Sequence, residues 1–156
     1  MKNIELVKQI QRIKDLIDKT SDASADSLEL QSHWAKYLCV LCSGLLENSI
    51  PELYGEYVKK KSNQEINHFV VSNLEKYLNP KTGRFIEVSN AFNKDWGREL
   101  ELFVDQDGRR EAIDAIIANR HKIAHGEDSG ITVVKIKEYL KRIIEVLNFI
   151  ETQTKR

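Results

Sequence analysis

The chain has 156 residues, and its 24 basic side chains balance 24 acidic ones, which gives a formal net charge of zero. This length suits a single domain spanning residues 1–156, large enough for a substantial core. A neutral chain carries no global basic field, so any contact with nucleic acid must come from a local patch. We expect a soluble cytoplasmic protein, because no apolar run reaches membrane-spanning length and the sequence does not begin like a signal peptide.

The first half of the chain shows apolar residues at helical spacing. One amphipathic helix is predicted from Leu6, Ile10, Ile13 and Ile17. The small, polar stretch from Thr20 to Ser27 is predicted as a connection. A second helix, apolar nearly all round and therefore central, is predicted from Leu30, Trp34, Leu38, Leu41 and Leu45. Ser49-Ile50-Pro51-Glu52 resembles a capping box with proline in the first turn, so we expect a break or kink there.

The helical pattern continues in the second half of the chain. Ser62-Asn63-Gln64-Glu65 has the same capping signature and predicts a helix through Ile66, Phe69, Val70, Leu74 and Tyr77. After a turn at 79–83, two short helices are predicted from Phe85, Val88 and Phe92 and from Trp96, Leu100 and Phe103. Thr132 caps a last helix, in which apolar residues from Val133 to Ile150 predict a packing or dimerisation seam. With no strand indicated, we expect an all-α fold, an up-and-down helical bundle.

An anomaly lies in the segment 113–126. Its apolar residues, which recur at the spacing of one buried helical face, are Ile113, Ile116, Ile117 and Ala124, and Gly126 is suited to end the helix. Arg120 occupies the face that should be apolar, and His121 follows four residues after Ile117 on the same face. Because arginine is seldom buried without a partner, this position requires a carboxylate, a phosphate or a water-filled groove.

Arg120 and His125 form an Arg-x4-His pair at the end of this helix. At about 100° per residue their side chains diverge by about 140°, so one copy does not make a closed site. Two such helices about a two-fold axis would bring both pairs into one positively charged cleft. A simpler explanation is that cationic groups at a helix C-terminus favour the macrodipole, but this does not account for an arginine on a buried face.

Three other patterns have simpler explanations than a functional site. Cys39 and Cys42 form a CxxC inside an apolar helix, without further zinc ligands nearby, so we favour two core thiols. His121 and His125 could both face a metal, but no third ligand is evident, and we expect no metal site. The basic runs 59–61 and 109–110 are typical of solvated surface.

The segment Arg120-His121-Lys122-Ile123-Ala124-His125-Gly126 resembles the signature of the HEPN superfamily of small helical domains. In that family an arginine precedes a histidine by a few positions near the end of a core helix. The helix ending Leu45-Leu46-Glu47, the segment from Asn79 to Phe103 and the closing helix after Ile131-Thr132-Val133 resemble the HEPN group found with RiboL-PSP proteins. His121 departs from the pattern, since asparagine or aspartate is more usual there.

The resemblance implies an HEPN-like domain that is a metal-independent endoribonuclease, acts on RNA as a homodimer, and needs no cofactor. HEPN proteins also occur as toxins and in defence against phage, which implies an antitoxin or another partner encoded by a neighbouring gene. Many members are inactive or only bind, so the alternative is a non-catalytic dimeric binding module.

The residues can supply the chemistry that the resemblance implies. RNA carries its own nucleophile, the 2′-OH, so His125 would act as base or acid and Arg120 would stabilise charge on the phosphate. Glu47 is a candidate for orienting Arg120 or His125, although it could equally be an exposed residue at the end of its helix. His121 and Asn119 are further supporting candidates, with His121 sharing the proton transfer or binding phosphate.

Overall fold

The computed structural model describes residues 1–23 and 27–156, with side chains placed in 1–20 and 27–156. All regular structure in this part of the chain is helical: α1 (Ile4–Ala23), α2 (Leu28–Lys61), α3 (Gln64–Leu74), α4 (Thr82–Phe92), α5 (Lys94–Val104), α6 (Arg109–Ala124) and α7 (Val133–Thr154). The prediction of an all-α fold is therefore confirmed. No helix among these residues is both long enough and apolar enough to cross a membrane.

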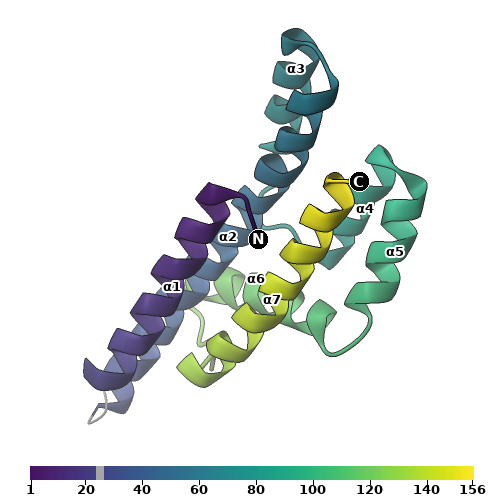
Figure 1. Cartoon of the computed structure of the whole chain (residues 1–156). Coiled ribbons are helices and arrows are strands. Elements are labelled where there is room, and N and C mark those ends of the chain that lie inside the picture. The colour runs from purple at the N-terminus through teal and green to yellow at the C-terminus, as the bar shows by residue number, and fades with distance from the viewer. Residues whose placement is uncertain (24–26) are drawn as a thin grey trace.

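Helix α2 organises the bundle, because it packs against α1, α3, α6 and α7 (Figure 1). Its buried side chains extend from Ala35 to Val58 and lie on several faces of the helix, as expected for a central element. Helices α4 and α5 pack against each other beside the C-terminal end of α7 (Figure 1). The candidate functional helix α6 is thus held between α2 and α7.

Of the break or kink predicted near Pro51, the break is wrong, because α2 continues through this residue to Lys61. Proline inside a helix removes one hydrogen bond and costs about 3 kcal/mol. Its neighbours Ile50, Leu53 and Tyr54 are almost fully buried, and each large apolar side chain contributes roughly 1.5–3 kcal/mol on burial. Packing of this segment therefore outweighs the local preference for ending the helix.

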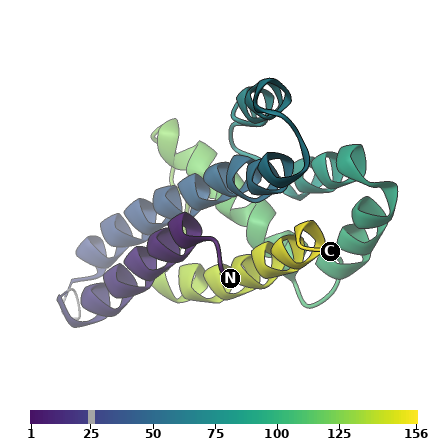
Figure 2. The same ribbon diagram turned by 45° about the horizontal axis from the view of Figure 1, so that its top comes forward.

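Helix α3 folds back on the end of α2, and together they protrude from the remaining helices (Figure 2). Ser62 ends α2, since its N–H donates to the Val58 carbonyl, and the Asn63 side chain caps α3 by accepting from the Ile66 N–H at 2.9 Å. The predicted helix start is confirmed to within a residue, whereas Tyr77 lies beyond its end. In the predicted connection, Thr20 belongs to α1, and residues 24–26 lie outside the described residues.

The apolar residues of α7 face the core of their own chain. Ile136, Leu140, Ile143, Leu147 and Ile150 are at most 2% exposed. The predicted seam is thus a packing surface within the bundle, and Thr132 caps α7 as predicted by accepting from the Lys135 N–H at 3.2 Å. A dimer must therefore use a different face of the molecule.

Both cysteines belong to the core, as predicted. Cys39 and Cys42 are free and fully buried, and the Cys39 thiol donates to the Ile116 carbonyl at 3.5 Å. Burial raises the pKa of Cys39 to about 12, and burial together with the neighbouring Cys39 raises the pKa of Cys42 further. These thiols pack α2 against α6 and are not available as nucleophiles.

Candidate active site

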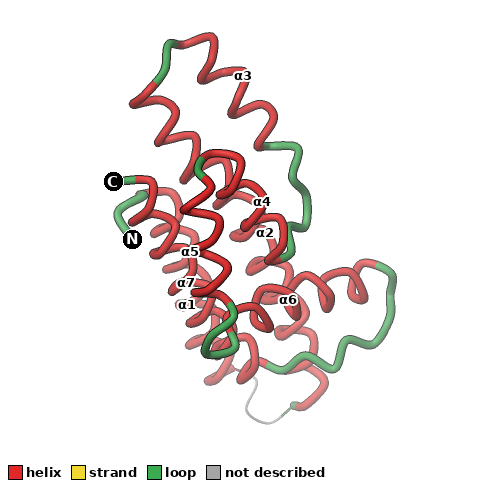
Figure 3. Tube along the Cα trace, turned by 90° about the vertical axis from the view of Figure 1, so that its right-hand side faces the viewer, coloured by secondary structure: helices red, strands yellow, loops and turns green. Residues whose placement is uncertain are grey.

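Helix α6 is anchored by a short apolar face and ends at a glycine. Ala112, Ile113, Ile116 and Ile117 are at most 4% exposed. At the C-terminus, Gly126 adopts a φ of 72°, its N–H donates to the Ile123 carbonyl at 3.1 Å, and the Glu127 N–H donates to the Lys122 carbonyl at 2.9 Å. This pair of bonds is a Schellman motif, which confirms that Gly126 ends the helix. The loop that follows is seen in Figure 3.

Arg120 lies where the buried face of α6 meets the surface, and it is partly buried. Among residues 1–20 and 27–156, its guanidinium forms neither a hydrogen bond nor an ion pair. Arg12 is the other arginine without an ion pair in these residues, and it is exposed. The remaining arginines each have a carboxylate partner: Arg84, Arg98, Arg109, Arg110, Arg142 and Arg156. Arg120 therefore presents unused donors for an anion at the surface of α6.

The two histidines of the motif lie together outside the core. Both His121 and His125 are exposed, and their ring centroids are 4.3 Å apart in an edge-to-face arrangement of 61°. The prediction that His121 and Ala124 continue the buried face is wrong, since both are exposed. The fully buried face ends at Ile117, and the residues of α6 after it are partly buried at Asn119, Arg120 and Ile123 and otherwise exposed, because the last turn of α6 extends past its neighbours.

Within one chain, no hydrogen bond in the described part joins Arg120 to His125. This agrees with the divergence of about 140° expected for residues five apart on a helix. His125 stands at the C-cap of α6, where its N–H donates to the carbonyls of His121 and Lys122 at 3.1 Å. The motif therefore presents its guanidinium and its imidazole on different sides of the helix end.

Glu47 and Asn119 have partners other than the motif residues. A Glu47 carboxylate oxygen accepts from the Asn79 backbone N–H at 2.8 Å, and no bond in the described chain joins it to Arg120 or His125. The Asn119 amide donates to the Ala115 carbonyl of its own helix at 2.8 Å. Glu47 thus fixes the loop that follows α3.

The structure adds a loop to the site that the sequence did not single out. Residues 79–81 precede α4, and both ends of this loop are held by carboxylates: Glu47 binds the Asn79 N–H, and Asp114 of α6 accepts from the Thr82 N–H at 2.8 Å. Asn79 adopts a positive φ of 48°. The sequence offered only the turn signature of the segment 79–83, which gave no indication of its neighbours.

The other sequence patterns do not converge on the motif. Arg109 is bound by Asp107 and Glu145, Arg110 is bound by Asp105, and the 59–61 run is exposed at the end of α2. In the part of the chain with described side chains, no three His, Cys, Asp or Glu residues are grouped so that they could hold a metal ion.

The molecule is an all-helical bundle, and α6 carries an Arg-x4-His pair at its C-terminal end. This is the arrangement of a HEPN domain. The chain belongs to the RiboL-PSP-HEPN family, whose model matches residues 3–156. No curated protein and no solved structure matches the chain.

Proposed function

We propose that this protein is an endoribonuclease that cleaves RNA by attack of a 2′-OH on the adjacent phosphodiester. The observation that carries the proposal is the partly buried Arg120, whose guanidinium has no anionic partner in the described chain, on a helix end that also carries the exposed imidazoles of His121 and His125. Membership of the family supports it, because HEPN domains are typically metal-independent ribonucleases.

The reaction requires a base, an acid and a group that stabilises negative charge. The His125 imidazole of one protomer removes the 2′-OH proton as the 2′ oxygen bonds to phosphorus. The bond from phosphorus to the 5′ oxygen breaks, and a protonated imidazole donates a proton to that leaving oxygen. Arg120 binds the non-bridging phosphate oxygens, where charge increases in the transition state. The products are a 2′,3′-cyclic phosphate and a 5′-OH.

A homodimer would complete this site. In a single chain Arg120 and His125 point to different sides of α6, so one copy holds the phosphate and the proton-transfer group apart. A two-fold axis near the exposed last turn of α6 would place the arginine of one protomer opposite the histidine of the other. The exposure of this turn leaves room for such a pairing.

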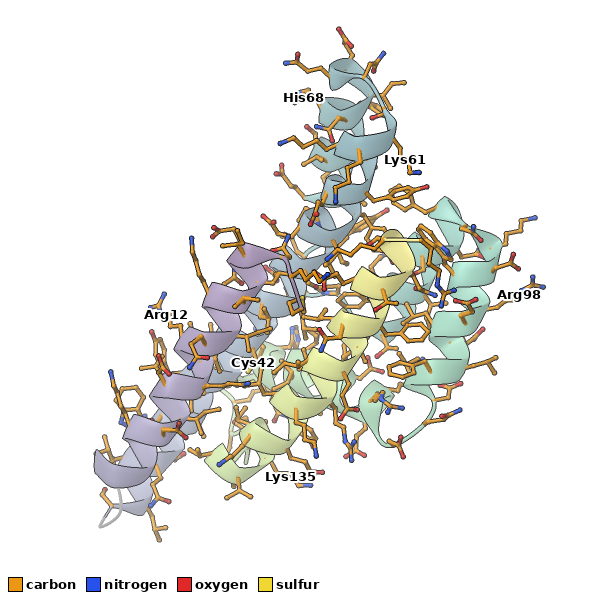
Figure 4. All side chains as sticks on the ribbon, in the orientation of Figure 1. Arg12, Cys42, Lys61, His68, Arg98 and Lys135 are labelled. Carbon is orange, nitrogen blue, oxygen red and sulfur yellow. The ribbon has the colours of Figure 1, made fainter. Side chains whose placement is uncertain are left out.

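Incubation of the purified protein with RNA in EDTA tests the proposal. We expect cleavage that is lost in Arg120→Ala and His125→Ala, and products with cyclic phosphate ends. Matched controls are Arg12→Ala on α1 and His68→Ala on α3, both exposed and far from α6 (Figure 4), which we expect to retain activity. An RNA with a single 2′-deoxy substitution at the cleaved position should resist cutting there.

Intact RNA, or cleavage unaffected by Arg120→Ala and His125→Ala, would overturn the proposal. RNA binding without cleavage would instead identify a binding module of the same fold. If the nuclease is active, a role as a toxin or in defence against phage predicts growth arrest on expression that depends on both motif residues. Co-purification of an inhibitory protein from a neighbouring gene would then identify its antitoxin.

A further inference from the structure

A cavity of about 520 Å³ lies beside the Arg-x4-His motif. It is bounded by the last two turns of α6 and by the loop before α4, and its walls are formed by Ile117, Ala118, His121, Lys122, Asn79 and Lys81, together with one acidic residue, Glu127, after the helix. Ligand pockets in proteins commonly enclose about 300–1,000 Å³, so this volume is adequate for one nucleotide. None of the residues that line it takes part in the cleavage step proposed above, except for His121, which was a supporting candidate.

His121 connects this cavity to the motif. Its ring lines the cavity and also lies 4.3 Å from the ring of His125, centroid to centroid. Arg120 is its neighbour in the chain. A group bound in the cavity would therefore lie next to the His125 imidazole, the proposed proton-transfer group.

The wall opposite α6 is held in place by long-range hydrogen bonds. Glu47 accepts from the Asn79 N–H and Asp114 accepts from the Thr82 N–H, each at 2.8 Å. Asn79 adopts a left-handed φ of 48°, a conformation that asparagine tolerates better than most residues. The Ser43 hydroxyl donates to the Asn79 side-chain oxygen at 3.5 Å, so the amide is oriented while its NH2 group has no partner among the described residues.

The chemistry of the cavity is that of a site for a nucleotide. Ile117 and Ala118 supply an apolar wall and His121 an aromatic ring, and exposed bases stack on aromatic and apolar surfaces. Lys81 and Lys122 have no carboxylate within ion-pair distance in the described chain, and they can bind backbone phosphates. The NH2 group of Asn79 can donate to an acceptor on a base edge.

We propose that this cavity binds one nucleotide of the RNA next to the cleaved phosphodiester, with Asn79 reading its base edge and Lys81 contacting its phosphate. This assignment rests on the proposed ribonuclease function. It makes Asn79 a specificity-determining residue and Glu47 the positioning residue that fixes it. The ligand is a segment of an RNA chain rather than a free nucleotide, because the site lies alongside the motif.

The test compares Asn79 variants that preserve the backbone. Asn79→Gly removes the side chain and keeps the left-handed φ, and Asn79→Asp replaces the amide donor by an acceptor. We expect each to reduce kcat/KM for the preferred base about tenfold and to alter the order of preference among four oligonucleotides that differ at one base.

Lys81→Ala should raise KM several-fold, leave kcat unchanged and reduce the salt dependence of binding. Lys76→Ala, an exposed lysine before the same loop and outside the cavity, is the matched control.

Binding is measured separately with a labelled oligonucleotide and the non-cleaving His125→Ala protein, and thermal unfolding verifies that each variant is folded. Cleavage with base preference unchanged in Asn79→Gly and Asn79→Asp, and KM unchanged in Lys81→Ala, would overturn the nucleotide site while the ribonuclease function stands. Binding that requires Lys81 without any cleavage by the wild-type protein would support the site and overturn the ribonuclease. A mononucleotide that binds as tightly as the oligonucleotide would overturn the assignment to RNA.

Discussion

The carboxylate of Glu47 in α2 and the backbone N–H of Asn79 are joined by a 2.8 Å hydrogen bond across 32 residues of sequence. Glu47 lies near the middle of the central helix, whereas Asn79 lies in the loop that forms one wall of the cavity beside the motif. The bond thus connects the core helix to the candidate site. It also satisfies a backbone donor that the positive φ of Asn79 would otherwise leave without a helical partner.

Glu47→Ala removes the acceptor and leaves the Asn79 N–H unpaired in a partly buried environment. We expect a loss of about 1–3 kcal/mol in the free energy of unfolding, measured by urea denaturation. Glu101→Ala, an exposed glutamate on α5, should change this free energy by less than about 0.5 kcal/mol. A Glu47→Ala protein of wild-type stability whose kcat is abolished would instead favour direct contact with Arg120 or His125.

Two glycine substitutions, one in the Schellman motif after α6 and one inside α4, are expected to change the stability of the protein in opposite directions. Gly126 has a φ of 72°, so Gly126→Ala forces an alanine into the left-handed region and should destabilise the protein by roughly 1–2 kcal/mol. Gly83 lies within α4 with free space around a Cβ atom, so Gly83→Ala should stabilise the protein by about 0.5–1 kcal/mol. Thermal unfolding of both variants gives the signs, and stabilisation by Gly126→Ala would contradict the helix end described here.

Gly126→Ala should also affect the candidate site, because His125 is the C-cap residue directly before it. Fraying of this turn would move the imidazole relative to Arg120. We expect a fall in ribonuclease activity larger than that caused by a substitution of equal thermal cost elsewhere in the bundle. Gly97→Ala offers such a comparison, since its Cβ would approach the Asn90 Cα at 2.9 Å between α4 and α5, away from α6.

The burial of the two cysteines predicts that they are inert in the folded protein. Burial raises the pKa of Cys39 to about 12, so almost no thiolate is present at neutral pH. Reaction with a thiol reagent at pH 8 should be negligible in the native state and complete in urea. Ser32→Cys, which places a thiol at an exposed position of the same helix, should react at once and serves as the positive control. Rapid labelling of the native wild-type protein would contradict this packing.

The helices could be predicted from the sequence because their signals are local. Apolar spacing defined α1, α4, α5 and α7, and a single glycine defined the end of α6. Pro51 misled the prediction because a local preference for a helix start competes with the burial of Ile50 and Leu53, which only the tertiary packing reveals. The motif at Arg120 was recognisable because a charged residue on a buried face is rare.

The surroundings of the motif could not be predicted, because they depend on contacts between distant segments. Glu47 and Asn79 lie 32 residues apart, as do Thr82 and Asp114, and no periodicity encodes these pairings. The burial of His121 was predicted wrongly because helical spacing gives the direction of a side chain but not the length of the neighbouring helices that would cover it. The cavity between α6 and the 79–81 loop follows from both of these features.

Glu151 near the end of α7 holds the N-terminal segment through its carboxylate. It accepts from the backbone N–H groups of Lys2 and Asn3 at 2.7–2.9 Å and forms ion pairs with Lys155 and with the N-terminal amine of Met1. Burial raises the pKa of this carboxyl, but the hydrogen bonds from Lys155, Lys2 and Asn3 outweigh burial, and the pKa lies below its ordinary value. The two chain ends are thereby held at the same end of α7 (Figure 1).

Because folding lowers the pKa of Glu151, the folded state binds the proton less tightly than the unfolded state does. The resulting stabilisation is complete above the unfolded pKa of about 4.3 and is lost as the pH falls through the folded pKa. We expect Glu151→Gln to lower the free energy of unfolding by about 1–3 kcal/mol at pH 7, and the difference from wild type to shrink below about pH 4. Urea denaturation at pH 7, 5 and 3.5 measures this. As a control, Glu87→Gln breaks the exposed pair with Arg84 and should lower the free energy of unfolding by less than about 1 kcal/mol at pH 7. A difference between Glu151→Gln and wild type that stays constant down to pH 3.5 would contradict the role assigned to Glu151.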